Sequence, residues 1–499
     1  MFEQLPSPES LARADDAAVV SAIEAFGRAE NSAAAARLAA VAELMARRLF
    51  DDDDERDKWA CDGWDSVAAE VAAALGLSHR RASGQMHLAH ALRTRLPRTA
   101  AKLAAGAISL RTAATIAWRT KLVETSEALA TIDAELAARA AGWGPLSDSR
   151  LDTSIDAVLD EHDPDAKLEY HVGARARDIQ FGKPDDTTGT TSVFGSLTSP
   201  DATLFDRRIR AMIANICSDD PRTVGQRRSD AVGLLLSGAD RLACRCGKSD
   251  CGGAGTDDRA GTVVIHVVAE ERAVRQASTA MTRPARTPSN QAAPTETEAA
   301  PTESGEPDTG RRPAAVLQGG RVVPAPLLAE LIATGATLRP LRAPDQAAEP
   351  RYRPSAKLAA FIRARDLTCR FPGCNAPAER CDIEHTIPYQ RGGPTHPSNL
   401  ACLCRKHHLL KTFWTEWAET QHPDASITWT TPTGKTYTTY PGSRAVFPNW
   451  DTSTAALPPA AKPAASDADR GLQMPKRKRT RRAEQAQRIK SERARNGSG

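Results

Sequence analysis

The N-terminal third of the chain has the hydrophobic pattern of packed α-helices. Residues 10–160 are rich in alanine, the strongest helix former, and place apolar side chains at helical spacing with few prolines or glycines. Within this region, residues 64–96 divide into an apolar helix, a short turn and a second helix that Ser78 can cap. Arg80 and Arg81 open the second helix, as in a DNA-reading helix-turn-helix, although an ordinary helical hairpin has the same pattern.

The pattern changes after residue 165. Residues 168–177 and 262–269 alternate or are β-branched and predict strands, whereas 201–217 and 229–242 predict helices. Between Val274 and Val316 the chain has no Ile, Leu, Val or aromatic residue, so this Pro-, Thr- and Glu-rich stretch cannot bury a core.

These changes predict a mainly α, multidomain chain. The expected parts are a helical accessory domain with a few strands (10–275), a disordered linker (276–315), a short connecting segment (316–350), a compact module (351–450) and a disordered basic tail (451–499).

Composition narrows the class of protein. Of the 499 residues, 41% are hydrophobic and 26% charged, and no stretch approaches the roughly 20 apolar residues of a membrane span. The first residues lack the basic start and apolar core of a secretory signal. We therefore expect a cytoplasmic protein that does not enter a membrane.

The net charge of +4 hides a segregation of charge along the chain. Residues 471–499 hold ten Lys or Arg against two Glu, and residues 351–412 hold eleven against four acids, so the remaining chain is acidic. Basic segments of this kind predict a polyanionic partner such as DNA, because neutralised phosphates release counterions. A tail that only increases solubility would carry the same charge.

Cysteine and histidine cluster in the predicted module. In a cytoplasmic chain such clusters favour a metal over disulfides. Cys369 and Cys374 form a knuckle, and Cys404 and His407 lie on one helical face, which predicts a closed, tetrahedral zinc site. Cys402 is an alternative to His407 as the fourth ligand.

A second set of residues remains beside this zinc site. His408 follows His407 and therefore points about 100° away around the helix, where it can meet Glu384 and His385 arriving from a strand. The other candidates of the module have ordinary structural interpretations: Cys381 in the core, His396 and His422 in loops or at the surface, and Trp414, Trp417 and Trp429 in the core of a small domain.

Another short cluster, Cys244, Cys246 and Cys251, resembles a metal site that lacks a fourth ligand. His266 on the following predicted strand is a candidate for that ligand. A group of reduced thiols in a loop is the alternative.

Residues 369–411 resemble the HNH endonucleases, the ββα-metal nucleases. The residues occur in the order typical of that family: Glu384 and His385 at a strand end, a Gly-Gly loop, Asn399, and then the Cys404–His408 segment. Glu384 stands where the family often has Asp. The region of about residues 10–345 resembles the proteins with "domain of unknown function 222" of high-GC Gram-positive bacteria, on the pattern of residues 64–106 and the Cys244–Cys251 cluster.

The HNH resemblance implies a hydrolase that cleaves phosphodiester bonds in DNA, most naturally double-stranded. His385 would be the general base, Glu384 and His408 would hold a divalent ion (Mg²⁺ or Mn²⁺, or else Zn²⁺ or Ni²⁺), and Asn399 would bind that ion or orient the loop. The alternatives are a non-catalytic, zinc-containing DNA-binding protein and a regulator that reads DNA with residues 64–96. The residues expected to contact phosphates are Arg370, Arg391, Arg405, Lys406, Lys411, Lys476, Arg477, Lys478 and Arg479.

Overall fold

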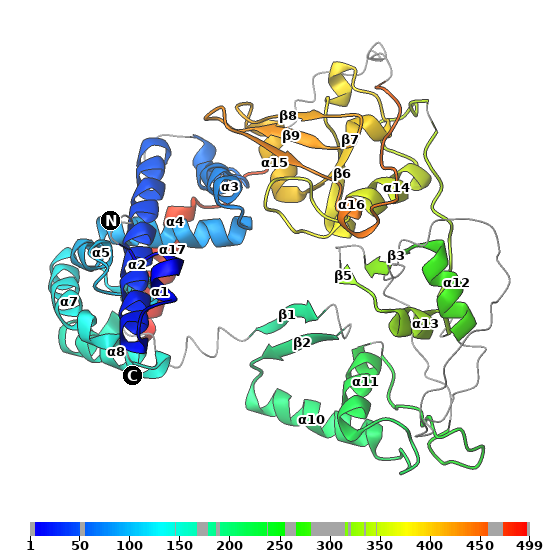
Figure 1. The fold of residues 1–499 in the computed structure, drawn as a ribbon, viewed down its shortest axis with the longest axis horizontal. Helices are drawn as coiled ribbons and strands as arrows, with labels where there is room; N and C mark the ends of the chain where they lie inside the picture. The colour runs from blue at the N-terminus through cyan, green and yellow to red at the C-terminus, as the bar shows by residue number, and fades with distance from the viewer. Residues whose placement is uncertain are drawn as a thin grey trace. The chain divides into compact units, whose positions relative to one another are not determined.

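The computed structural model describes residues 5–49, 55–144, 146–166, 178–185, 190–236, 238–254, 266–280, 315–317, 321–333, 336–345, 347–457 and 473–496. The chain divides into two compact units (Figure 1). Unit 1 combines Met1–Tyr170 with Leu341–Gly499, and unit 2 is His171–Pro340. The predicted accessory domain of residues 10–275 is therefore corrected, because its first part packs with the C-terminal module and its second part belongs to unit 2.

The N-terminal part of unit 1 is helical, as its alanine-rich pattern predicts. Its helices surround one apolar core that includes Leu38, Met86, Ile116 and Ile155. The helices are α1 (Pro8–Leu11), α2 (Asp16–Arg48), α3 (Gly63–Leu75), α4 (His79–Thr94), α5 (Pro97–Ala104), α6 (Leu110–Arg119), α7 (Ser126–Arg139) and α8 (Asp148–His162) (Figure 1).

Helices α3 and α4 form the predicted helix-turn-helix pair. The Asp62 carboxylate accepts a hydrogen bond from the Asp65 amide and caps α3, and Gly76 ends it in the left-handed conformation. Ser78 is the N-cap residue of α4, but its side chain makes no capping hydrogen bond. The turn contacts the C-terminal module, because a Cβ on Gly373 would lie 2.2 Å from the Leu77 carbonyl oxygen. The hairpin thus supports the packing of unit 1.

The C-terminal module contains two small antiparallel sheets and three helices. Strands β6 and β7 pair from Cys381–Cys404 to His385–Leu400, and the second sheet has the order β10-β9-β8. Trp414, Trp417 and Trp429 are buried in the core of the module, as predicted. The elements are α14 (Ala356–Asp366), β6 (Cys381–His385), β7 (Leu400–Cys404), α15 (Arg405–Phe413), β8 (Ala418–Gln421), β9 (Ile427–Thr430), β10 (Thr436–Thr439) and α16 (Ser443–Val446).

The predicted disordered tail is corrected over its last part. Arg481–Asn496 forms helix α17, and Ile489 packs against the N-terminal core. Arg493 donates hydrogen bonds to the Asp163 carboxylate at 2.8 and 3.1 Å and to the Leu122 carbonyl at 2.9 Å. Basic residues of this segment thus bond to acidic side chains and carbonyl groups of unit 1. The composition of the segment does not predict these partners.

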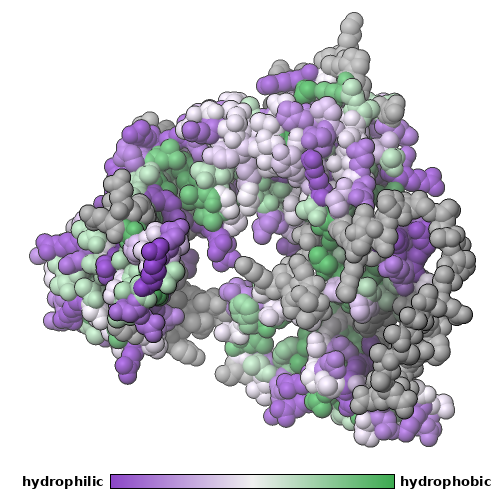
Figure 2. All heavy atoms as spheres, viewed as in Figure 1, coloured by the Kyte–Doolittle hydropathy of each residue, from purple (hydrophilic) through white to green (hydrophobic). Residues whose placement is uncertain are grey.

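Unit 2 consists of short elements around two small apolar clusters. They are β1 (Ile179–Asp185), β2 (Thr190–Gly195), α10 (Ser199–Ile213), α11 (Val224–Leu236), β3 (Val267–Ala269), α12 (Glu271–Ala280), β4 (Ala315–Leu317), β5 (Arg321–Val322) and α13 (Ala325–Ala333). Apolar side chains gather on the surface over β1 and β2, where Phe181, Val193 and Phe194 are exposed (Figure 2).

The predicted linker differs at both ends from the structure. Helix α12 continues to Ala280, and β4 pairs with β3 from the far side of the linker. The remainder of the linker and the predicted strand at 168–177 lie outside the described residues. Among the described residues, no helix is both long enough and apolar enough to cross a membrane.

Candidate active site and metal centres

A β-hairpin followed directly by a helix holds the candidate residues of the C-terminal module. Glu384 and His385 end β6, Cys404 ends β7, and α15 begins at the next residue. Because β7 runs into α15 without a loop, Cys404 becomes the N-cap residue and His407 and His408 lie in the first turn. The hairpin register and the helix start therefore place all these residues together.

The four predicted zinc ligands converge. The ligand atoms of Cys369, Cys374, Cys404 and His407 all lie within 4.8 Å of one another. His407 Nδ1 is 3.3 Å from Cys404 Sγ and 3.5 Å from Cys369 Sγ, and Cys374 Sγ is 4.0 Å from Cys404 Sγ. Sulfur ligands around a tetrahedral zinc ion with bonds of about 2.3 Å lie about 3.8 Å apart, so these donors fit zinc.

The surroundings of this cluster support the same ligand set. The His407 ring stacks on Phe371 with 4.0 Å between ring centroids, and its Nε2 is buried without a hydrogen-bond partner. The Nδ1 atom is thus the one that faces the thiols. Cys402 is buried near the Ile362 carbonyl, and Cys381 lies against the carbonyls of residues 376 and 377.

Glu384 and His408 form a second pair of ligand atoms. His408 Nε2 is 3.1 Å from Glu384 Oε2, and its Nδ1 is 2.8 Å from Asp382 Oδ2. Adjacent ligands of an octahedral ion with bonds of roughly 2.1 Å lie about 3 Å apart, so the pair fits Mg²⁺ or Mn²⁺. The contact from Asp382 is the arrangement that orients a metal-binding histidine through its other nitrogen. The sequence motif did not indicate Asp382, although alternation along β6 puts it on the same face as Glu384.

The charge on this pair depends on its partners. Burial opposes ionisation of Glu384, but the hydrogen bond with His408 and the charge of Lys411 lower the pKa of Glu384 to about 2. Burial also opposes protonation of His408, but the hydrogen bond with Glu384 raises the pKa of His408. Both shifts favour the charged forms, a carboxylate on Glu384 and an imidazolium on His408.

Lys411 is an internal residue of the site, which corrects the expectation that it contacts phosphate. Its Nζ donates to Glu384 Oε1 at 3.1 Å and to the His385 carbonyl at 2.7 Å, and it pairs with Glu419 at 3.2 Å. Burial raises the pKa of Glu419 to about 7, although Lys411 acts in the opposite direction. Glu419, on β8, was not found from the sequence because it lies beyond the matched motif.

His385 lies on the opposite face of β6 from Glu384. Its Nε2 is 2.9 Å from Thr395 Oγ1, and the Thr395 hydroxyl donates to the Arg351 carbonyl at 2.5 Å. Because that hydroxyl proton is already used, Nε2 is the donor to Thr395 and Nδ1 carries the lone pair. Burial lowers the pKa of His385, which favours this neutral form. Tyr352 stacks on the ring at 5.3 Å, and His385 is only 2% exposed.

Asn399 holds the loop that follows His385. Its Oδ1 accepts a hydrogen bond from the Ile387 amide at 2.7 Å, and its Nδ2 donates to the carbonyls of Ile387 and Pro394. The loop passes close to this side chain, since a Cβ on Gly393 would lie 2.9 Å from Asn399 Nδ2. Of the two roles that were open for Asn399, the geometry favours orientation of the loop.

The basic residues expected to contact phosphate fall into two groups. The prediction that Arg370 contacts phosphate is wrong. Arg370 is 2% exposed and donates hydrogen bonds to Asp366 and to the carbonyls of Ala425 and Thr439. Lys406 and Arg477 pair with acidic residues at the start of α3. Those with exposed side chains are Arg391, Arg405, Lys476, Lys478 and Arg479.

The short cysteine cluster of unit 2 gains a member that the sequence did not indicate. Cys217 joins Cys244, Cys246 and Cys251, with all four sulfur atoms within 4.8 Å of one another. The expectation that His266 supplies the fourth ligand is therefore corrected. Cys217 precedes the others by a whole helix, so spacing alone could not connect it to them.

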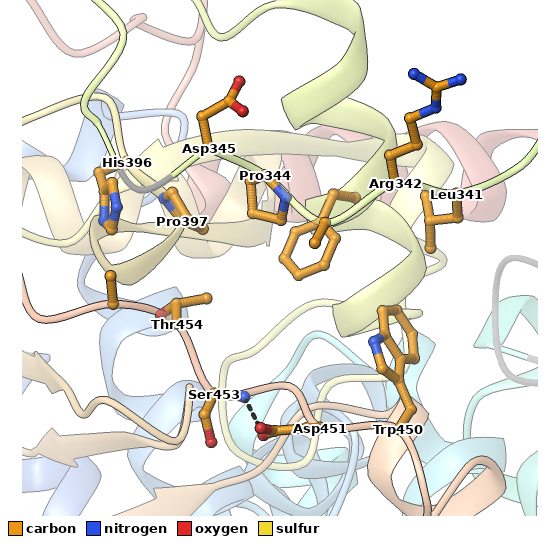
Figure 3. A pocket seen from close by; sticks show the side chains of 13 residues that line it. Leu341, Arg342, Pro344, Asp345, His396, Pro397, Trp450, Asp451, Ser453 and Thr454 are labelled. Atoms are coloured by element: carbon orange, nitrogen blue, oxygen red, sulfur yellow. Dashed lines mark hydrogen bonds between the residues drawn. The ribbon is translucent and has the colours of Figure 1, made fainter.

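A pocket of the C-terminal module lies away from these side chains. It has a volume of about 300 Å³ and is lined by Phe361, Pro397 and Trp450 among others (Figure 3). None of Glu384, His385 and His408 lines it. Glu384 instead lines a second pocket together with Lys411 and Glu419, and its volume is only about 10 Å³. The candidate active site therefore encloses almost no free volume.

Comparison with known proteins identifies the family of the chain. Residues 26–366 match the family described as "Domain of unknown function (DUF222)". The chain belongs to the DUF222 family. This confirms the second resemblance seen in the sequence, and the match ends before the Glu384–His408 site begins.

Relatives of this DUF222 protein are found in Mycobacterium tuberculosis. "Uncharacterized protein Rv3776" is 53% identical over 99% of this chain and 93% of its own length, and "Uncharacterized protein Rv2100" is 53% identical over 99% of this chain and 91% of its own length. "Uncharacterized protein in est 3'region" is 50% identical over 72% of this chain and its own full length. No solved structure gives a significant match.

Proposed function

We propose that this DUF222 protein is a metal-dependent HNH endonuclease that hydrolyses phosphodiester bonds in DNA. The observation that carries the proposal is the pairing of Glu384 Oε2 with His408 Nε2 at 3.1 Å. The same hairpin and helix also contribute Cys404 and His407 to the group of four candidate zinc ligands. His385 follows Glu384 directly, and Asn399 fixes the adjoining loop, so the residues of the HNH motif lie in one small region.

Each residue has a role that follows from its contacts. The hydrogen bond to Thr395 leaves the lone pair of His385 on Nδ1, so His385 can take the proton of a water that attacks phosphorus. Glu384 and His408 would hold the divalent ion, with Asp382 orienting His408. Such an ion neutralises the scissile phosphate and stabilises the leaving oxygen. Zinc at Cys369, Cys374, Cys404 and His407 would fix the start of α15.

Cleavage of supercoiled plasmid tests the proposal. With Mg²⁺ or Mn²⁺ the full-length protein should nick or linearise the plasmid, and His385→Ala should reduce the rate by about 100-fold or more, the usual contribution of a general base. His422→Ala is the matched control, because the His422 side chain bonds to Thr428 of the neighbouring strand, outside the candidate site. DNA binding and zinc content should be the same in all three proteins.

The alternatives predict other outcomes of the same assay. A non-catalytic DNA-binding protein would bind DNA and contain zinc, but the wild type would be as inert as His385→Ala across several divalent ions. That result would reject the endonuclease. A regulator that reads DNA with α4 would lose binding on substitution of the exposed Arg80 and Arg81, while His385→Ala would leave binding intact.

A further inference from the structure

Unit 2 contains a cluster of four cysteines built from two separate segments. Cys217 lies in the connection between α10 and α11, whereas Cys244, Cys246 and Cys251 lie in the loop after α11. Cys217 Sγ and Cys244 Sγ are 3.5 Å apart, and all four sulfur atoms are mutually within 4.8 Å. All four are free thiols and half-buried.

An internal ion pair joins the two segments independently of the thiols. The Asp220 carboxylate accepts hydrogen bonds from the Arg222 guanidinium at 2.8 and 3.0 Å and from the Arg245 amide at 2.8 Å. Arg222 also donates to the Ala243 carbonyl at 2.7 Å. Asp220 and Arg222 are both buried, so this pair fixes Cys217 beside Cys244 without any contribution from sulfur.

The cysteine loop has the backbone of a metal-binding knuckle. Gly247 follows Cys246 with a positive φ of 72°, a conformation that suits glycine. The Cys244 amide donates to the Gly253 carbonyl at 2.8 Å, which closes the loop. A Cβ on Gly253 would lie 2.4 Å from the Asn215 carbonyl oxygen, so the backbone passes close to the segment that carries Cys217.

We propose that Cys217, Cys244, Cys246 and Cys251 bind a structural zinc ion that stabilises unit 2. Four soft sulfur ligands without a carboxylate or an open position are the donor set of a closed, tetrahedral zinc site. A metal would stabilise unit 2 because its apolar core is small. Among the described residues, the cluster beside α10 and α11 has five buried members, Ile209, Met212, Ala231, Leu234 and Leu242. A bound metal adds folding free energy that so small a core cannot supply. This site is independent of the proposed endonuclease activity.

Zinc measurement on the full-length protein, purified under reducing conditions, tests the site. The wild type should contain about two zinc ions per chain, one here and one in the C-terminal module. Cys217→Ser should contain one, and Cys217→His should retain the second ion because imidazole is also a zinc ligand. Cys61→Ala is the matched control, since Cys61 belongs to neither cluster, and it should retain both.

A second pair of variants assigns each ion to its site. Cys374→Ser with Cys404→Ser removes two ligands of the module and should leave one zinc ion, which is then lost when Cys217→Ser is added. Cobalt bound to that remaining site should give the visible absorption of a four-thiolate centre. One zinc ion in the wild type and none in the Cys374/Cys404 variant would overturn the proposal.

Discussion

Asp382 is the residue that distinguishes a metal-binding His408 from an ordinary ion pair. Its carboxylate lies 2.8 Å from Nδ1 of His408 while Nε2 faces Glu384. A carboxylate in this position fixes the tautomer and ring orientation of a metal ligand, and its loss usually weakens metal binding by about 10- to 100-fold.

Asp382→Asn should therefore weaken Mn²⁺ binding by about that factor and leave zinc content unchanged. Titration of the zinc-loaded protein with Mn²⁺ by calorimetry gives the dissociation constant. Asp424→Asn is the control, because Asp424 is a partly exposed carboxylate that bonds to Ser426 outside this site. Equal dissociation constants for wild type and Asp382→Asn would show that Asp382 does not support a metal ligand.

Residue spacing predicted which neighbouring residues form a site, but it did not predict contacts between residues that are distant in the sequence. Cys404, His407 and His408 are three residues of one helix start, so their directions follow from helix geometry. Cys217 could not be connected to its cluster because its contact depends on how α11 folds back. The charge of Arg370 and Lys411 likewise gave no information on whether their partners are phosphates or buried carboxylates of the same chain.

At the scale of elements, helix α17 shows how a basic sequence can be misassigned. Residues 481–496 contain few apolar side chains, so their composition predicts a solvated tail. The structure instead places Ile489 on the N-terminal core and Arg493 against Asp163 and the Leu122 carbonyl. Alanine-rich helices were predicted correctly because their stability is local, whereas α17 depends on acidic partners more than 300 residues away in the sequence.

Removal of the Arg493 side chain tests the docking of α17. Arg493→Ala should lower the free energy of unfolding by about 1.5–3 kcal/mol, because charge-assisted hydrogen bonds to a carboxylate and a carbonyl are lost. Lys490→Ala on the same helix is exposed and should change stability by less than about 0.5 kcal/mol. Urea denaturation measures both. Equal stabilities would mean that α17 does not dock through Arg493.

At the scale of the whole unit, an acidic pair at the start of α3 connects distant parts of the chain. Asp65 contacts His79 at 3.1 Å, Lys406 at 2.7 Å, Arg477 at 3.3 Å and Arg481 at 3.2 Å. These partners come from α4, α15, the segment before α17 and α17 itself. Nearby Asp62 also pairs with Arg477 and Arg481. Unit 1 is therefore joined by charge as well as by its apolar core.

This cluster should make the stability of unit 1 sensitive to acid. Burial acts to raise the pKa of Asp65, but the hydrogen bond with His79 and the charge of Lys406 hold it well below its usual value. Because the pKa is lower in the folded than in the unfolded protein, the stabilisation is complete above about pH 4 and is lost as the pH falls further. The loss approaches about 1.4 kcal/mol per pH unit for this group.

Asp65→Asn should remove this contribution. At pH 7 the variant should be less stable by about 3 kcal/mol, since three cations lose a buried partner, and the difference from wild type should shrink steadily below pH 4. Urea denaturation at several pH values measures it, with the exposed Glu416→Gln as control. A difference that stays constant down to pH 2 would show that the effect of the substitution is one of packing. In that case the ionised carboxylate would not be what joins the N-terminal helices to the C-terminal module.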